Sequence, residues 1–146
     1  MKIIDLEPGD PRLGAEILPV LRELRPHLTE ELFAEVYAEG HGQGLRFSAV
    51  YDGGGCVGVA GWRVIVNTSG LRTLYVDDLV TAEAARSQGV GHALLAYLEE
   101  RGRALRCRRL RLDSGTQRTD AHRFYLRERM GIRAFTFMKP LDGEEG

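Results

Sequence analysis

Residues 85–100 are ARSQGVGHALLAYLEE, in which two glycines, Gly89 and Gly91, stand at the start of an amphipathic helical pattern. The apolar residues recur at the spacing of one helix face: Val90, Leu94, Tyr97 and Leu98. Glycine is a poor helix former, but it lets a ligand approach the backbone closely. Since a helix N-terminus offers unpaired N–H groups and Arg86 lies just upstream, the stretch predicts a phosphate-binding turn. A tight strand-to-helix turn without a ligand would use the same glycines, so this stretch alone leaves both interpretations open.

Two familiar phosphate-binding loops do not fit the stretch. The chain has no Gly-x-x-x-x-Gly-Lys-Ser/Thr sequence, which excludes a P-loop. Gly89-Val90-Gly91 lacks the third glycine of a dinucleotide fingerprint and does not follow the first strand. Another kind of phosphate ligand is therefore expected.

Length and composition predict one globular domain over residues 1–146, with residues 142–146 as a frayed tail. Of the 146 residues, 43% are hydrophobic and 28% charged, and the net charge is -1. These values indicate neither a nucleic-acid partner nor a membrane partner.

Cys56 and Cys107 match neither a disulfide framework nor a metal site. With no signal-peptide pattern at the N-terminus, we expect a cytoplasmic protein without a metal.

The hydrophobic pattern predicts a mixed α/β domain with the order β-α-α-β-β-β-α-β-α-β. Turn signals join three central strands into an antiparallel meander, and the strand–helix–strand unit around Gly89 predicts a splayed parallel pair, Leu71–Thr81 and Arg109–Asp113. Pro19 should kink or divide the first helix, and Thr29 should cap the second, which should end at Gly40. The expected strands are 2–6, 45–51, 56–66, 71–81, 109–113 and 133–138. The expected helices are 13–24, 29–40, the one that begins after Gly89, and 120–129.

Two motifs resemble those of the GNAT superfamily of N-acetyltransferases. Arg86-x-x-Gly89-x-Gly91 is similar to the family's acetyl-CoA signature, Arg/Gln-x-x-Gly-x-Gly/Ala. The segment 121–132, AHRFYLRERMGI, resembles the later Ala-x-x-Phe-Tyr-x-x-x-x-Gly-Phe motif. The element order is also the family's, so the resemblance covers essentially the whole chain. Arg118 stands where the family often has Asn, and Ile132 where it has Phe.

The resemblance implies acetyl-CoA as co-substrate and identifies the residues that would bind it. The turn would hold the pyrophosphate of CoA through Arg86, Ser87, Gln88, Gly89, Val90, Gly91 and His92. The pantetheine arm would pair like an additional strand with Leu79, Val80 and Thr81. This pairing requires an exposed backbone edge, which a bulge or a splaying of the parallel strands would provide.

The reaction that the resemblance implies is direct attack of an amine on the thioester. An alkyl amine has a pKa near ~10.4 and must lose a proton first, so a nearby carboxylate would assist. The candidates are Asp77 and Asp78. A regular strand puts Asp77 on the face of Tyr75 and Asp78 on the opposite face. The resemblance favours Asp77, although either carboxylate could instead bind an arginine or backbone amides.

Tyr125 occupies the position of the family's phenolic acid, which protonates the departing CoA thiolate. Backbone N–H groups near Val80 would polarise the thioester carbonyl. The competing interpretation of Tyr125 is a core aromatic side chain whose hydroxyl has a structural partner.

The acceptor would be an amine of a small molecule or a peptide. Asp77 and Asp78 suit a cationic amine such as a polyamine, an aminoglycoside or a lysine side chain. A homodimer is compatible with the resemblance. Two other functions remain: a catalytically silent domain that binds acyl-CoA as a sensor or partner module, and a nucleic-acid-binding domain that uses the basic run 101–111. The presence of Tyr125 and an acid favours the enzyme, and the basic run lacks interleaved aromatics.

Overall fold

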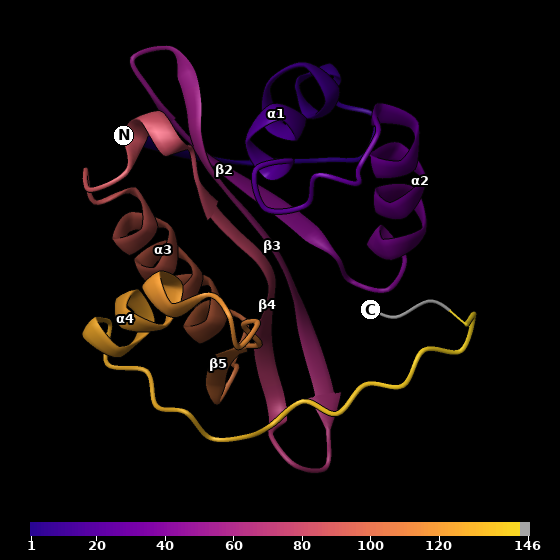
Figure 1. Cartoon of the computed structure of the whole chain (residues 1–146), viewed down its shortest axis with the longest axis vertical. Coiled ribbons are helices and arrows are strands. Elements are labelled where there is room, and N and C mark those ends of the chain that lie inside the picture. The colour runs from indigo at the N-terminus through magenta and orange to yellow at the C-terminus, as the bar shows by residue number, and fades with distance from the viewer. Residues whose placement is uncertain (144–146) are drawn as a thin grey trace. The chain divides into compact units, whose positions relative to one another are not determined.

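Five strands form one mixed sheet in the order β1-β2-β3-β4-β5 (Figure 1), in a computed structural model that describes residues 1–143. The strands are β1 (Lys2–Leu6), β2 (Arg46–Asp52), β3 (Gly55–Asn67), β4 (Leu71–Thr81) and β5 (Arg109–Leu112). The first four pair antiparallel, while β4 and β5 pair parallel. The predicted meander and the predicted parallel pair are therefore both confirmed.

The chain forms two compact units, Met1–Leu112 and Asp113–Gly146. The sheet and three α-helices belong to the first unit, and the second contains α4 (Thr119–Arg127). Part of the predicted frayed tail, residues 144–146, lies outside the described residues.

The helical segments of the first unit follow the signals in the sequence. A π-helical turn (Leu13–Ile17) leads into the short α1 (Leu18–Leu21), so the segment is divided next to Pro19 as predicted. α2 (Glu30–His41) begins at Thr29, whose hydroxyl accepts a hydrogen bond from the Leu32 N–H at 3.1 Å. The helix continues one residue beyond Gly40, where we expected its end. None of the helices within residues 1–143 has the length and apolar character of a membrane span.

A 3₁₀ turn (Glu83–Ala85) and α3 (Val90–Ala104) connect β4 to β5. In the first unit, α1 and α2 cover one face of the sheet and α3 covers the other (Figure 1). Val90, Leu94 and Leu98 of the predicted stripe are buried against the sheet. Burial of apolar side chains on both faces therefore fixes the sheet between two helical layers.

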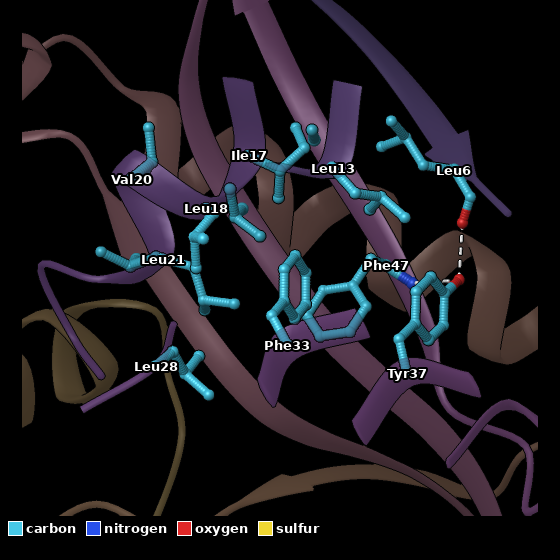
Figure 2. Close-up of a cluster of buried hydrophobic side chains, with 13 residues drawn as sticks. Leu6, Leu13, Ile17, Leu18, Val20, Leu21, Leu28, Phe33, Tyr37 and Phe47 are labelled. Atoms are coloured by element: carbon cyan, nitrogen blue, oxygen red, sulfur yellow. Dashed lines mark hydrogen bonds between the residues drawn. The ribbon is translucent and has the colours of Figure 1, made fainter. Parts of the chain in front are cut away.

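Tyr37 of α2 ties the helix to the end of the β1–β2 ladder (Figure 2). Its hydroxyl donates to the Leu6 carbonyl and accepts from the Phe47 N–H at 3.3 Å, at the point where Leu6 and Phe47 face each other. The ring packs edge-on against Phe47, with centroids 4.8 Å apart. Burial raises the pKa of Tyr37, so the hydroxyl stays protonated as a donor.

β4 carries one residue more than β3 at the centre of their ladder. Gly61 faces Asp78 and Trp62 faces Val76, so Asp77 has no residue opposite it. This β-bulge reverses the alternation of side chains along β4. Val76, before the bulge, packs in the cluster beneath α3, whereas Val80, after it, packs in the cluster beneath α1 and α2.

The bulge corrects the expected orientation of Asp78. A regular strand puts Asp77 and Asp78 on opposite faces, and this prediction is wrong for Asp78, because both residues lie on the α1–α2 side. Gly61 makes room for this arrangement, because a Cβ there would lie 2.8 Å from Asp78 Oδ2 and 2.9 Å from Phe47 Cε1.

The predicted final strand, residues 133–138, is absent from the described structure. The alternation in RAFTFM gives strand propensity, but a strand also needs a hydrogen-bonded neighbour. The described part of the second unit contains no other strand that could supply one. Phe135 and Phe137 are instead exposed.

We predict that Tyr37→Phe lowers the free energy of unfolding by about 1–2 kcal/mol, because the Leu6 carbonyl loses its buried donor. Urea denaturation monitored by circular dichroism measures the change. Leu32→Ala, on the exposed side of the same helix, serves as the control and should have a smaller effect. Equal stability of Tyr37→Phe and the wild type would contradict the role given to the hydroxyl.

Candidate functional site

The turn before α3 presents backbone N–H groups to solvent. Gly89 is the N-cap with φ 80°, and Ser87 also has a positive φ of 66°. Residues 86–89 are exposed, while Ala85 and Val90 on either side are buried and anchor the turn. No side chain within the described residues caps α3, and a Cβ at Gly89 would meet nothing within 4 Å. The turn is therefore open and has the partial positive charge of a helix N-terminus.

The end of β4 has a free backbone edge within Met1–Leu112. β5 pairs with β4 only from Thr73 to Val76, and the parallel ladder stops at the bulge. Leu79–Thr81 remain paired with β3 on their other side. The exposed backbone edge that an added strand requires is thus present at Leu79–Thr81.

A cavity of about 580 Å³ lies on the α1–α2 side of the bulge. Asp77 and Asp78 both line it, and Asp78 is the less exposed of the two, at 14% against 26% for Asp77. The remaining lining residues are Leu21, Arg25, His27, Leu28, Phe33, Val36, Glu39, Gly40, Gln43, Leu45, Phe47 and Arg63. The volume is in the range of small-molecule sites.

Each of the two carboxylates binds its own arginine. Arg63 Nε lies 2.9 Å from Asp77 Oδ2, and Arg63 Nη2 lies 3.1 Å from Asp77 Oδ1. Arg25 Nε lies 2.8 Å from Asp78 Oδ1, and Arg25 Nη2 donates to the Asp77 carbonyl at 3.1 Å. The interpretation that these carboxylates bind arginines is therefore confirmed, and it is compatible with a catalytic role.

Burial raises the pKa of Asp77 above its ordinary value, and the hydrogen bonds from Arg63 oppose this shift. The buried position disfavours the charged carboxylate, whereas the guanidinium favours it. A carboxylate with a raised pKa is a better proton acceptor, because its basicity approaches that of the group it deprotonates.

Tyr125 lies in the second unit on α4, half-buried, with its ring centroid 5.5 Å from that of Phe124. Burial raises the pKa of its hydroxyl, while the charge and hydrogen bond of Arg118 lower it. A hydroxyl that remains protonated at neutral pH suits a proton donor. Arg118, which departs from the family pattern, is therefore a neighbour of the proposed acid.

Sequence reasoning missed Arg25 and Arg63 as residues of the site. Alternation along β3 puts Arg63 on the face opposite to that of its buried neighbour Trp62. It does not predict which carboxylate Arg63 binds. Arg25 comes from the segment after α1 and contacts residues 52 and 53 positions further along the chain. Only the folded sheet brings these groups together.

A comparison with known protein families identifies the family of this chain. Residues 14–132, which include parts of both compact units, match the Acetyltransferase (GNAT) family. The chain belongs to this family. It is an acetyl-CoA-dependent N-acetyltransferase with the mixed sheet and parallel β4–β5 pair expected of the fold.

Three similar proteins illustrate the range of this family. Uncharacterized N-acetyltransferase YhdJ of Bacillus subtilis is 33% identical over 130 residues, which cover 87% of this chain and 91% of the relative. Aminoalkylphosphonate N-acetyltransferase of Salmonella typhimurium is 39% identical over 66 residues, 45% of this chain and 43% of the relative. The structure of aminoglycoside N-acetyltransferase AAC(6')-Iy in complex with CoA has a TM-score of 0.78 at 15% identity, covering 94% and 93% of the two chains.

We predict that Arg63→Gln raises the pKa of Asp77 further, because it removes the guanidinium that favours the carboxylate. Carboxyl-detected NMR titration measures the shift. Arg12→Gln is the matched control, since Arg12 lowers the pKa of Asp10 to about 2 outside the cavity. The control should raise the pKa of Asp10 and leave that of Asp77 unchanged. A wild-type pKa of Asp77 below 3.8 would contradict the dominance of burial.

The same shift predicts how Asp77 contributes to stability. Its pKa is higher in the folded than in the unfolded chain, so the folded chain binds the proton more tightly between the two values. The contribution of Asp77 to the free energy of unfolding therefore falls as pH rises from 3.8 to the folded pKa. Urea denaturation of Asp77→Asn and wild type across this range should show a difference that changes with pH, and a constant difference would contradict the assignment.

Proposed function

We propose that the protein transfers the acetyl group of acetyl-CoA to a primary amine of a small molecule by direct attack. The observation that carries the proposal is the bulge at Asp77, which brings Asp78 to the side of Asp77, so that both carboxylates line the cavity directly before the free edge Leu79–Thr81. The cavity volume and the substrate in the name of the Salmonella relative both support a small-molecule acceptor. The proposal takes residues 1–146 as one catalytic domain, because the family match includes parts of both units.

The open turn before α3 is the proposed pyrophosphate site. Its backbone N–H groups and the side chain of Arg86 complement the negative charge, and Gly89 leaves the approach unobstructed. The residues assigned to this role are Arg86, Ser87, Gln88, Gly89, Val90, Gly91 and His92. The edge Leu79–Thr81 then receives the pantetheine arm as an added strand. Acetyl-CoA, when bound, supplies an acetyl thioester.

Asp77 is the proposed base, acting directly or through a water molecule. It removes one proton from the ammonium form of the acceptor, so the nitrogen lone pair becomes available to form the new C–N bond. Its raised pKa favours this role, and Arg63 holds the carboxylate in the cavity. Asp78 is the second candidate, more buried and held by Arg25.

The N–H groups near Val80 stabilise the charge that develops on the thioester oxygen.

Tyr125 is the proposed acid. When the C–S bond breaks, its hydroxyl gives a proton to the departing thiolate, which leaves as the free thiol. The nitrogen loses its second proton as the amide forms, and this proton restores the Tyr125 hydroxyl through solvent. The net proton released is the one that Asp77 removes from the ammonium group. The raised pKa keeps the proton on Tyr125 until this step. The contact with the Phe124 ring restricts the motion of the half-buried Tyr125 side chain.

We predict that Arg86→Ala combined with Gly89→Val abolishes CoA binding measured by calorimetry. The variant removes a positive charge and places a β-branched side chain at φ 80°, where only glycine is unstrained. Gly9→Val is the matched control, since Gly9 has φ 89° and open space around it. The control should bind CoA like the wild type. Unchanged binding by the double variant would reject the turn as the pyrophosphate site.

We predict that Tyr125→Phe lowers kcat by roughly 10²-fold, a low value for general acid catalysis because a thiolate is a comparatively stable leaving group. Thiol release measures turnover, and calorimetry should show unchanged affinity for CoA. Tyr97→Phe, which removes a hydroxyl that donates to Asp5, is the control for loss of a phenol. An unchanged kcat would assign Tyr125 a structural role instead.

A further inference from the structure

Four charged side chains form one cluster in the cavity: Arg25, Arg63, Asp77 and Asp78. Each carboxylate is already bound by a guanidinium, so the two acids do not present two free negative charges. A polyamine needs several unneutralised carboxylates to offset the cost of desolvating its charges. The four charges cancel, so the cluster does not offer the excess negative charge that a multiply cationic acceptor requires.

The two guanidiniums approach the aspartates from different elements. Arg63 projects from β3, and Arg25 follows α1 and reaches both the side chain of Asp78 and the backbone of Asp77. The hydrogen bonds to the aspartates use Nε and Nη2 of each arginine, so Nη1 of each lies outside them. Arg63 is held further by Tyr75, whose ring centroid lies 5.2 Å from Arg63 Cζ.

Both arginines remain open to a ligand. Their side chains are 43% exposed for Arg25 and 38% for Arg63, more than either aspartate partner. Arginine is suited to this task, because its planar group binds carboxylate, phosphate or phosphonate oxygens through several N–H groups at once.

The rest of the cavity complements a short molecule with opposite charges at its ends. Glu39 of α2, an exposed residue, adds a third carboxylate to the lining. An apolar wall can contact a short carbon chain, and it consists of Leu21, Leu28, Phe33, Val36, Leu45 and Phe47.

We propose that the acceptor is a small amine that also carries an anionic group, either a carboxylate, a phosphonate or a phosphate. Arg25 and Arg63 bind the anionic group, while the amine lies toward Asp77. The inference rests on the acetyl transfer proposed above and specifies its acceptor. It also gives the two arginines a role in substrate selection in addition to holding the aspartates.

Matched acceptors test this inference. The pairs are 2-aminoethylphosphonate with ethylamine and β-alanine with propylamine, and spermidine represents the polyamines. In each pair the anionic member should have a kcat/KM at least 10-fold higher, mainly through a lower KM. Binding of 2-aminoethylphosphonate in the presence of CoA, measured by calorimetry, gives a readout that does not require turnover.

Arginine variants then assign the effect to residues. Arg25→Gln should lower the ratio of kcat/KM between the anionic and the plain amine at least 10-fold, and Arg63→Gln should do the same. Arg63→Lys, which keeps the charge, should restore part of the ratio. Arg12→Gln is the matched control, since it disrupts an arginine–aspartate ion pair outside the cavity and should leave the ratio unchanged. A purely structural role of Arg25 would lower both activities equally and leave the ratio intact, which would overturn the inference.

The outcomes separate the inference from the proposed function. Acetylation of spermidine or plain amines as efficiently as of the anionic amines overturns the inference and leaves the acetyltransferase intact. CoA binding without acetylation of any amine, and without binding of 2-aminoethylphosphonate, overturns both.

Discussion

The extra residue in β4 is the constraint on which the site depends. Without the bulge at Asp77, strand alternation would send Asp78 to the α3 face of the sheet, away from the cavity. The bulge also coincides with the end of the ladder between β4 and β5, after Val76. One local irregularity therefore brings the two carboxylates to one face and coincides with the start of the free strand edge. Gly61 permits it, because a side chain at this position would collide with Asp78.

The helices on the two faces of the sheet position different parts of the proposed site around this bulge. On one face, α3 packs through Val90, Leu94 and Leu98, which holds the turn at Gly89 at a fixed place beyond the end of β4. On the other face, α1 and α2 build the walls of the cavity, and Tyr37 fastens α2 to β1 and β2. Rigid packing on both sides thus fixes the proposed co-substrate and acceptor regions relative to β4.

Local patterns were sufficient to predict most of the fold. Alternating apolar residues and hairpin turns gave the meander, and the glycine turn before a clean helical stripe gave the β4–α3–β5 unit. The alternation of side chains predicted the wrong face for Asp78, because it assumes that every strand residue pairs with a residue of the neighbouring strand. The strand predicted at residues 133–138 is also wrong, because strand propensity alone does not provide the neighbouring strand that its hydrogen bonds need. Arg25 and Arg63 were not predictable, since their partners lie far along the chain, 53 and 14 residues away.

The central claim is that the free edge of β4 and the turn before α3 together form the CoA site. Backbone amide hydrogen exchange with and without CoA tests it most directly. The account predicts slower exchange at Leu79–Thr81 and at residues 88–91 on CoA addition. Thr73–Val76, already paired with β5, should not change. Binding of CoA that leaves exchange at Leu79–Thr81 and at the turn unaltered would contradict the account.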